Sequence, residues 1–252
     1  MKIAVITGAS SGMGREFAVR VAQTEQLDEI WVVARRRERL EALAGQIGTP
    51  VRILAMDLTE RESLDRYRAL LNDEKPDVRI LVNASGFGKF GRFTDMEYDA
   101  MMNMIDLNDK AYVAITYLTL PYMQSGAEIY QLDSLSAFQP VPYINVYGAT
   151  KAFVLSFSRA LNVELKSRKI RVMAVCPGWV KTEFFDRAVV DDTIVYYNKF
   201  FTAEQVVKRA LRDMKKGKDV SVCGASVRLQ VFFTKLLPHR LVMKIWCRQQ
   251  KK

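Results

Sequence analysis

The chain has 252 residues, of which 49% are apolar, enough for one large domain or two small ones with a substantial core. No apolar run reaches the length of about 18 residues that predicts a membrane-spanning helix. The N-terminus begins as a strand rather than a signal peptide, so we expect a cytoplasmic protein. A single histidine, His239, and three widely spaced cysteines, Cys176, Cys223 and Cys247, argue against a Ser-His-Asp hydrolase, a disulfide framework or a metal site.

The net charge of +10 comes entirely from the C-terminal end. Residues 208–252 hold 13 lysines and arginines against two aspartates, whereas the first 207 residues hold 25 basic and 26 acidic residues. A nucleic-acid-binding protein would be expected to carry its charge across a recognisable module. We therefore expect no nucleic-acid partner.

Short β-branched runs alternate with amphipathic helical stretches from the first residue onward. In chain order, strands are predicted at 2–7, 29–34, 51–56, 78–82, 128–132, 170–176 and 219–223, and helices at 12–25, 36–47, 61–72, 96–123, 146–167 and 203–216. This alternation is typical of βαβ units. It predicts an α/β fold, a Rossmann-like doubly wound parallel sheet of about seven strands with helices on both faces. That domain spans residues 1–223, and a basic amphipathic extension follows at 224–252.

A glycine-rich turn lies between the first strand and the first helix and reads Thr7-Gly8-Ala9-Ser10-Ser11-Gly12-Met13-Gly14. Glycines at such a turn let the backbone approach a pyrophosphate, and the helix N-terminus supplies amides and a positive dipole. The position of the turn in the chain therefore predicts a dinucleotide site.

The end of the second predicted strand reads Ala34-Arg35-Arg36-Arg37. Folds that prefer NAD place a carboxylate here for the ribose 2′-hydroxyl, whereas arginine pairs with a 2′-phosphate. The alternative is that the arginines merely begin a solvated helix. We predict NADP(H) as cofactor, with Arg35 as the first contact.

Tyr147 and Lys151 lie four residues apart in a predicted helix, and Ser134 precedes them. A phenol with the ordinary pKa of about 10 is a poor acid or base near neutral pH. A lysine charge about 5 Å away favours the phenolate by roughly 3 kcal/mol at an effective dielectric of about 20. That is enough to lower the pKa by about two. The pattern predicts Tyr147 as the acid/base, with Ser134 on the oxygen whose proton moves.

Together these residues resemble the short-chain dehydrogenase/reductase family, in its form with a Tyr-x-x-x-Lys active site, over residues 2–223. The motifs that carry the resemblance are the turn at 7–14, Asp57, Asn83-Ala84-Ser85-Gly86, Asn108, Ser134, Tyr147-x-x-x-Lys151 and Pro177-Gly178-x-x-x-Thr182. The resemblance implies a catalytic tetrad of Asn108, Ser134, Tyr147 and Lys151. In it, Asn108 would hold a water that connects Lys151 to solvent, and Lys151 would also hydrogen-bond the nicotinamide ribose.

The resemblance also implies a set of cofactor contacts. Asp57 would contact the adenine, Asn83 would line the cofactor at the end of its strand, and Thr182 would meet the carboxamide or the phosphates. The full set is Gly8, Ser10, Ser11, Gly12, Met13, Gly14, Arg35, Asp57, Leu58, Asn83, Ala84, Tyr147, Lys151, Pro177, Gly178, Val180 and Thr182.

The chain departs from the family pattern at a few positions. Asn83-Ala84-Ser85-Gly86 replaces the usual Asn-Asn-Ala-Gly, and Ala111 and Met173 replace a usual Gly and Asn. Asp133-Ser134 replaces the usual pair of serines. Asp133 could act electrostatically on the nicotinamide end or face away, and we favour the second.

The loops expected to cover the substrate are rich in aromatic and apolar residues, namely Phe87, Phe90, Phe93, Phe138, Val141, Tyr143, Phe184, Phe185, Tyr196, Tyr197, Phe200 and Phe201. Such a lining suits a bulky lipophilic substrate, although half of these rings could be ordinary core. In the extension, Pro238 is expected to separate two short amphipathic helices. Their apolar faces could pack on the domain or a dimer partner, which we favour, or contact a peripheral membrane surface or an anionic carrier.

The leading hypothesis is an NADP(H)-dependent oxidoreductase that interconverts a secondary alcohol and a ketone on a bulky lipophilic, hydroxysteroid-like substrate. One alternative is a 3-oxoacyl reductase acting on coenzyme A or carrier-protein thioesters. Another is a catalytically silent family member that serves as a binding module, against which the intact tetrad argues. The resemblance further implies a homo-dimer or homo-tetramer paired through the helices at 96–123 and 146–167.

Overall fold

A single parallel β-sheet forms the centre of the protein, and the structure, a computed structural model, describes residues 1–189 and 191–252. In order across the sheet, the seven strands are β3 (Val51–Ala55), β2 (Glu29–Ala34), β1 (Lys2–Thr7), β4 (Asp77–Asn83), β5 (Glu128–Leu132), β6 (Arg171–Val175) and β9 (Val220–Ser221). All six neighbouring pairs are parallel. The predicted doubly wound fold is confirmed.

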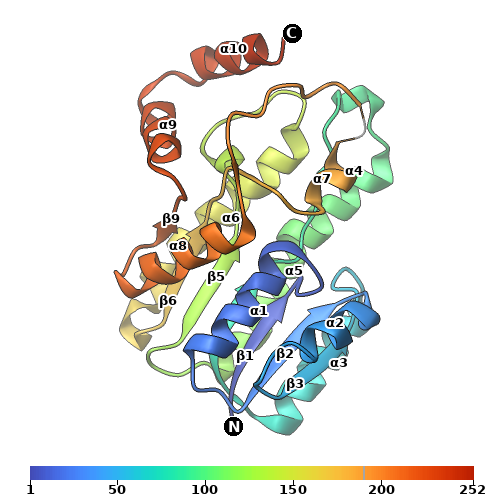
Figure 1. Ribbon diagram of the computed structural model, residues 1–252, viewed down its shortest axis with the longest axis vertical. Helices are drawn as coiled ribbons and strands as arrows, with labels where there is room; N and C mark the ends of the chain where they lie inside the picture. The colour runs from blue at the N-terminus through green and yellow to red at the C-terminus, as the bar shows by residue number, and fades with distance from the viewer. Residues whose placement is uncertain (190) are drawn as a thin grey trace.

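Helices cover both faces of the sheet (Figure 1). One face carries α1 (Gly12–Thr24), α2 (Arg37–Ala44) and α8 (Ala203–Lys215), and the other carries α3 (Arg61–Glu74), α5 (Ala111–Thr119) and α6 (Asn145–Glu164). Phe17 and Val21 of α1 are fully buried on the first face, and Tyr67 and Leu71 of α3 are fully buried on the second. Apolar residues at helical spacing thus anchor each layer to the strands, whose side chains alternate between the two faces.

The segment predicted as one helix over 96–123 is interrupted. It consists of α4 (Tyr98–Ile105), a π-helical turn η2 (Asp106–Lys110), α5 and a 3₁₀ turn η3 (Leu120–Tyr122). The π turn places Asn108 fully buried, where its side-chain oxygen accepts from the Phe87 amide at 3.1 Å and its nitrogen donates to the Phe87 carbonyl at 2.9 Å. The helix therefore widens at the point where Asn108 holds the loop that follows β4.

The other predicted elements differ from the observed ones by at most three residues at each end. A 3₁₀ turn, η5 (Leu165–Arg168), forms the end of the helix predicted at 146–167. The structure adds short elements that the sequence pattern did not predict: η1 (Phe93–Asp95), η4 (Leu135–Phe138), β7 (Trp179–Val180), α7 (Phe184–Ala188) and β8 (Phe200–Phe201). β7 and β8 pair in parallel as a separate two-stranded sheet. This pairing fixes the long segment after β6 above the carboxyl edge of the main sheet.

The C-terminal extension forms two helices, α9 (Ala225–Leu236) and α10 (His239–Gln249), which meet at Pro238 as predicted and lie along the edge of the molecule (Figure 1). Its inner side packs on the domain. Trp246 donates its indole N–H to the Pro142 carbonyl at 3.0 Å, and Gln250, 1% exposed, accepts from the Tyr196 amide at 3.0 Å. Among the described helices, none is long and apolar enough to cross a membrane.

Candidate active site

The glycine-rich turn leads from β1 into α1, beside the point where the strand order reverses between β1 and β4. Gly8 has a φ of +65°, and a Cβ there would lie 2.4 Å from the Ala84 carbonyl oxygen. A Cβ on Gly14 would lie 2.4 Å from the carbonyl oxygen of Gly8. Ser11, at the N-cap, makes no side-chain cap, so the first amides of α1 remain available to an anion. The turn fits a dinucleotide pyrophosphate.

A cavity of about 190 Å³ opens over this turn. Thirteen of the predicted cofactor contacts line it: Gly8, Ser10, Ser11, Gly12, Met13, Gly14, Arg35, Asp57, Leu58, Ala84, Tyr147, Lys151 and Thr182. The predicted contacts Pro177, Gly178 and Val180 line the adjacent, larger cavity instead.

Asn83 is the predicted contact that lines neither cavity. Its side chain is 1% exposed and donates to the Thr116 hydroxyl and the Gln131 side-chain oxygen, both at 3.0 Å. The side-chain amide thus ties β4 to β5 and α5.

Two arginines after β2 reach the cofactor cavity. Arg35 lies 3.5 Å from Asp57 and is 58% exposed. Arg36, which the sequence argument did not single out, donates to the hydroxyls of Ser10 at 3.0 Å and Ser11 at 3.1 Å. It also pairs with Glu183 at 3.0 Å, and its side chain is only 27% exposed. Because three arginines follow one another in the sequence, the pattern alone does not show which of them points towards the glycine-rich turn.

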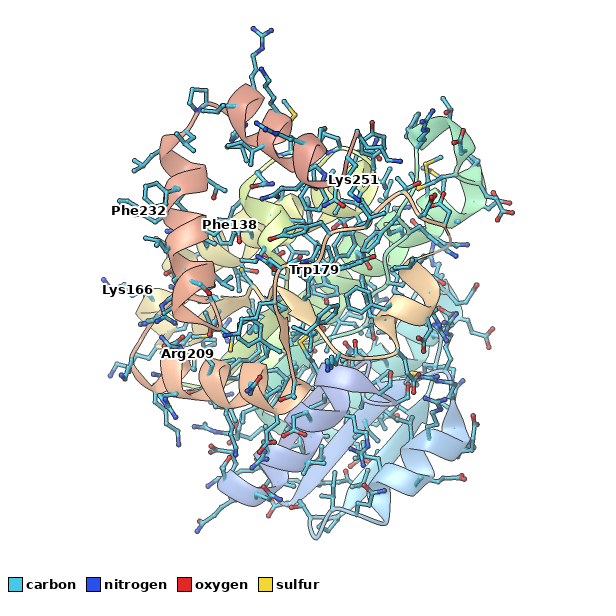
Figure 2. All side chains as sticks on the ribbon, turned by 45° about the horizontal axis from the view of Figure 1, so that its top comes forward. Phe138, Lys166, Trp179, Arg209, Phe232 and Lys251 are labelled. Atoms are coloured by element: carbon cyan, nitrogen blue, oxygen red, sulfur yellow. The ribbon has the colours of Figure 1, made fainter. Side chains whose placement is uncertain are left out.

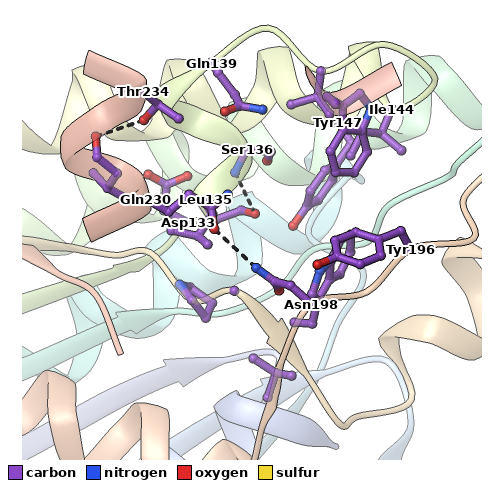
Figure 3. Close-up of a pocket in the computed structure, with 18 of the residues that line it drawn as sticks. Asp133, Leu135, Ser136, Gln139, Ile144, Tyr147, Tyr196, Asn198, Gln230 and Thr234 are labelled. Carbon is purple, nitrogen blue, oxygen red and sulfur yellow. Dashed lines mark hydrogen bonds between the residues drawn. The ribbon is translucent and has the colours of Figure 1, made fainter. Parts of the chain in front are cut away.

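Tyr147 and Lys151 project from the same face of α6, and both are buried, at 9% and 4% exposure. The Lys151 ammonium lies 5.7 Å from the centre of the Tyr147 ring and donates to the Leu132 carbonyl at 2.8 Å. Ser134 follows β5 and lines the larger cavity. Tyr147 lines the same cavity (Figure 3). Asn108 does not border either cavity; its side chain reaches this cluster through a 3.1 Å bond to Thr150.

The direction of the Tyr147 pKa shift is opposite to the sequence-based expectation. Burial raises the pKa of the phenol above its ordinary value, the Ser134 side chain acts to lower it, and the Asp133 carboxylate adds to the increase. The Lys151 ammonium donates to the Leu132 carbonyl, and burial lowers the pKa of Lys151 against the attraction of the Asp133 and Asp109 carboxylates. Tyr147 therefore carries its proton at neutral pH in this structure.

Two carboxyl groups beside Lys151 are also perturbed. Burial raises the pKa of Asp109 to about 7, against the attraction of Lys151. Burial likewise raises the pKa of Asp133 to about 7, against Lys151 and the thiol hydrogen bond of Cys176. Asp133 is 3% exposed and lines both cavities, so it does not face away from the site as we had favoured.

The larger cavity has a volume of about 410 Å³, and its lining includes Tyr147, Ser134 and residues of the C-terminal helices α9 and α10. Figure 3 shows Tyr147, Gln230 and Thr234 around it. Of the predicted aromatic and apolar residues, Phe90, Val141, Phe184, Phe185 and Tyr196 line it. Phe87 lines the cofactor cavity, and Phe93 is 58% exposed. Residues that the sequence argument did not assign complete the wall, above all Trp179, Phe233 and Trp246. Phe138, Tyr143, Tyr197, Phe200 and Phe201 do not border either cavity.

A parallel sheet with a glycine-rich turn at its switch point, beside a buried tyrosine, is the arrangement of a Rossmann-like dinucleotide-binding fold. The family described as short chain dehydrogenase matches residues 2–192, and the chain belongs to this family. It is an oxidoreductase that acts on CH–OH groups with a nicotinamide cofactor.

Three known proteins place the chain within the family. A serine 3-dehydrogenase of Agrobacterium fabrum is 36% identical over 186 residues, which cover 71% of this chain and 72% of that protein. A short-chain dehydrogenase of Sphingobium yanoikuyae, solved with NADPH, superposes with a TM-score of 0.78 at 28% identity, covering 97% of this chain and 96% of that one. A bulky-bulky ketone specific alcohol dehydrogenase of Comamonas testosteroni gives a TM-score of 0.74 at 26% identity, covering 88% and 86%.

Proposed function

We propose that the protein interconverts a secondary alcohol and a ketone on a bulky lipophilic substrate, with NADP(H) as cofactor. The observation that carries the proposal is the cavity of about 410 Å³ that adjoins Tyr147 and Ser134. Its wall is mostly apolar and includes the rings of Phe90, Phe185 and Trp246. Such a cavity favours a large apolar ligand with a single polar point of attachment.

The chain's own residues fit a proton transfer at the substrate oxygen. Tyr147 carries its proton at neutral pH. The oxygen of a ketone becomes strongly basic as it gains alkoxide character during reduction, so it can accept that proton even though burial makes the phenol a weaker acid. Ser134 lies at the same mouth of the cavity and would hydrogen-bond the same oxygen. The bound cofactor supplies or accepts the hydride. Lys151 and the amide of Asn108 would hold the tyrosine and the neighbouring loop in position.

NADP(H) is favoured over NAD(H) by the charge at the end of β2. Arg35 and Arg36 both border the cofactor cavity, and the carboxylate that would bind a ribose 2′-hydroxyl is absent from the sequence directly after β2. The Sphingobium protein, bound to NADPH, is a further support.

A screen of carbonyl substrates tests the proposal. NADPH oxidation would be followed with steroid ketones, aryl-alkyl ketones with two bulky substituents, 3-oxoacyl thioesters and small aldehydes, and NADP+ reduction with serine. We expect the highest kcat/KM with a bulky ketone. A preference for serine would show that the resemblance to the Agrobacterium enzyme extends to its substrate, and a preference for thioesters would establish the 3-oxoacyl reductase alternative. Absence of turnover with every substrate despite NADPH binding would favour the silent binding module.

We also propose that the outer face of the C-terminal helices contacts an anionic membrane surface. Leu229, Phe232 and Leu236 of α9 are 57%, 56% and 64% exposed, and Phe232 points away from the body of the molecule (Figure 2). Residues 220–252 contain seven lysines and arginines and no aspartate or glutamate. Apolar side chains beside such charge suit an anionic lipid surface. A second copy of the same face would be repelled, because both copies carry the same positive charge.

Vesicle sedimentation tests this contact. We expect binding to vesicles that contain phosphatidylserine and little binding to pure phosphatidylcholine, with loss of binding in a Phe232→Ser, Leu236→Ser double variant. Phe93→Ser, which removes a similarly exposed ring (58%) from η1, outside the C-terminal helices and the proposed oligomer interface, is the matched control. Equal retention by both kinds of vesicle, or binding only to an acidic carrier protein, would overturn the lipid assignment.

A homo-dimer or homo-tetramer paired through α4, α5 and α6 remains the proposed assembly. Exposed apolar residues on these helices support it, with Tyr98 at 69%, Tyr117 at 75% and Val163 at 72%. Light scattering that finds a monomer at micromolar concentration would contradict the assembly.

A further inference from the structure

Asp133 lies at the junction of the two cavities. Five residues border both of them: Met13, Asp133, Tyr147, Thr182 and Phe184. Because a hydride passes between groups in contact, the junction is where the reactive end of the cofactor and the substrate must meet. Asp133 is the one acidic residue among these five.

One oxygen of the Asp133 carboxyl group lacks a partner. Oδ2 accepts the thiol hydrogen of Cys176 at 3.4 Å. Oδ1 is buried and has no hydrogen-bond partner among residues 1–189 and 191–252. An ionised carboxylate held in this way is costly unless a charge or a proton compensates it.

The titratable groups around Asp133 come from every element packed on it. Lys151 and Tyr147 face it from α6, Asp109 from the π turn, Tyr112 from α5, and Cys176 from the end of β6. Lys235 of α9 acts on Cys176 from farther out. Lys151 is the one cation directly beside Asp133 in this group, and its ammonium is bonded to the Leu132 carbonyl. Lys151 and the backbone N–H of Ser134 favour the Asp133 carboxylate, yet burial outweighs them and Oδ1 has no hydrogen-bond partner among the described residues.

We propose that Asp133 discriminates between the two redox states of the nicotinamide cofactor. Its ionised carboxylate stabilises the positively charged ring of the oxidised form. When the uncharged ring of the reduced form is bound, Asp133 is protonated. The inference rests on the cofactor site proposed above. NADP+ and NADPH differ in charge only at this ring, so contacts to the phosphates and the ribose cancel when their dissociation constants are compared.

The proposal fixes the sign of a pH dependence. In the free protein Asp133 loses its proton near pH 7. A positive ring lowers that pKa, so NADP+ binding below pH 7 releases a proton and tightens as the pH rises. A neutral ring does not lower the pKa of Asp133. NADPH binding above pH 7 therefore takes up a proton or leaves protonation unchanged, and the affinity for NADPH does not increase as the pH rises. The ratio of the NADPH to the NADP+ dissociation constant should therefore rise with pH, by about tenfold or more, since an adjacent opposite charge shifts a carboxyl pKa by roughly 1–3.

Isothermal titration calorimetry on the full chain without substrate tests this, with NADP+ and NADPH at pH 5.5, 7 and 8.5 in two buffers of different ionisation enthalpy. We expect proton release on NADP+ binding at the lower pH, and a rising ratio in the wild type. Asp133→Asn should abolish both, and Asp133→Ser provides the same test if the amide variant does not fold. Cys176→Ala removes only the thiol hydrogen bond and should move the transition to higher pH.

Asp109→Asn is the matched control, because Asp109 also adjoins Lys151 and has a raised pKa but does not border the cofactor cavity. It should change the ratio by less than about threefold, as expected for a screened charge farther from the ring. A pH-dependent ratio that persists in Asp133→Asn would assign the proton to another group, such as Lys151, and overturn the proposal. Repeating the titrations with NAD+ and NADH separates the two proposals: if neither nucleotide pair binds, the proposed function fails, whereas binding of a pair with a pH-independent ratio rejects only the role of Asp133.

Discussion

Replacing Arg36 should weaken NADPH binding far more than NADH binding. The guanidinium is 27% exposed and already bonded to Ser10 and Ser11, so it is held over the phosphate-binding turn. A hydrogen bond to a charged group is worth about 1.5–3 kcal/mol, and each 1.4 kcal/mol is about tenfold in affinity. Arg36→Ser should therefore raise the NADPH dissociation constant by about 10- to 100-fold and leave that of NADH within about threefold.

Arg35 should contribute less than Arg36. Its side chain is 58% exposed and 3.5 Å from Asp57, and solvent reduces the worth of an exposed pair to about 0.2–1 kcal/mol. Arg35→Ser should cost less than about fivefold in NADPH affinity. Arg35→Asp reverses the charge and should move the preference further towards NADH. Arg37→Ser is the control, since Arg37 is 62% exposed, pairs with Glu41 and does not line the cavity.

Fluorescence titration with NADPH and NADH checks both arginines. Glu183→Gln adds a second arm, because the Glu183 carboxylate now occupies Arg36 and would compete with a 2′-phosphate. This variant should strengthen NADPH binding and leave NADH binding unchanged. An unchanged NADPH-to-NADH ratio in both Arg35→Asp and Arg36→Ser would refute the assignment of the 2′-phosphate to this end of β2.

Three further changes have defined outcomes. Tyr147→Phe should leave NADPH binding within about twofold and reduce turnover by about 10²–10⁴, the usual contribution of a general acid; retention of more than a tenth of wild-type kcat would reject Tyr147 as the proton donor. Gln250→Ala removes the acceptor for the Tyr196 amide and should raise KM more than it lowers kcat, with thermal stability measured in parallel; an unchanged KM would show that this contact does not hold the cavity closed. Asp109→Asn should raise Tm at pH 8 and have little effect at pH 4, because its folded pKa of about 7 lies above the unfolded value, so the folded state loses stability as pH rises between the two; equal Tm changes at both pH values would contradict the raised pKa.

The order of strands and helices was predictable from the sequence because each element repeats its apolar residues with its own period. The glycine-rich turn was also predictable, since Gly8 and Gly14 occupy positions that a side chain cannot fill. The π turn at Asn108 was not predictable, because its cause is a tertiary contact with Phe87 that leaves no local pattern.

Parts of the site made by distant segments were likewise hidden. β7 and β8 have two residues each, too few to show a period, and they pair across about twenty positions. Trp246 meets the loop at Pro142 across more than a hundred residues. The orientation of the Asp133 side chain depends on its hydrogen bond with Cys176, which lies more than forty residues away in the sequence. The spacing correctly predicted that Lys151 lies on the same helix face as Tyr147. It did not predict the pKa of Tyr147, because burial raises that pKa and burial cannot be read from the spacing.

The cavity under α9 and α10 has a consequence for how this protein could change its substrate. The family match ends at residue 192, whereas Gln230, Phe233, Leu237, Ile245 and Trp246 of the last 28 residues all line the larger cavity. Tyr147 and the glycine-rich turn lie in the part shared with relatives, and much of the wall of the larger cavity lies outside it. Grafting a different C-terminal segment would therefore change which substrate fits without changing Tyr147, Ser134 or the glycine-rich turn. This segment is thus the natural unit of exchange for both evolution and engineering.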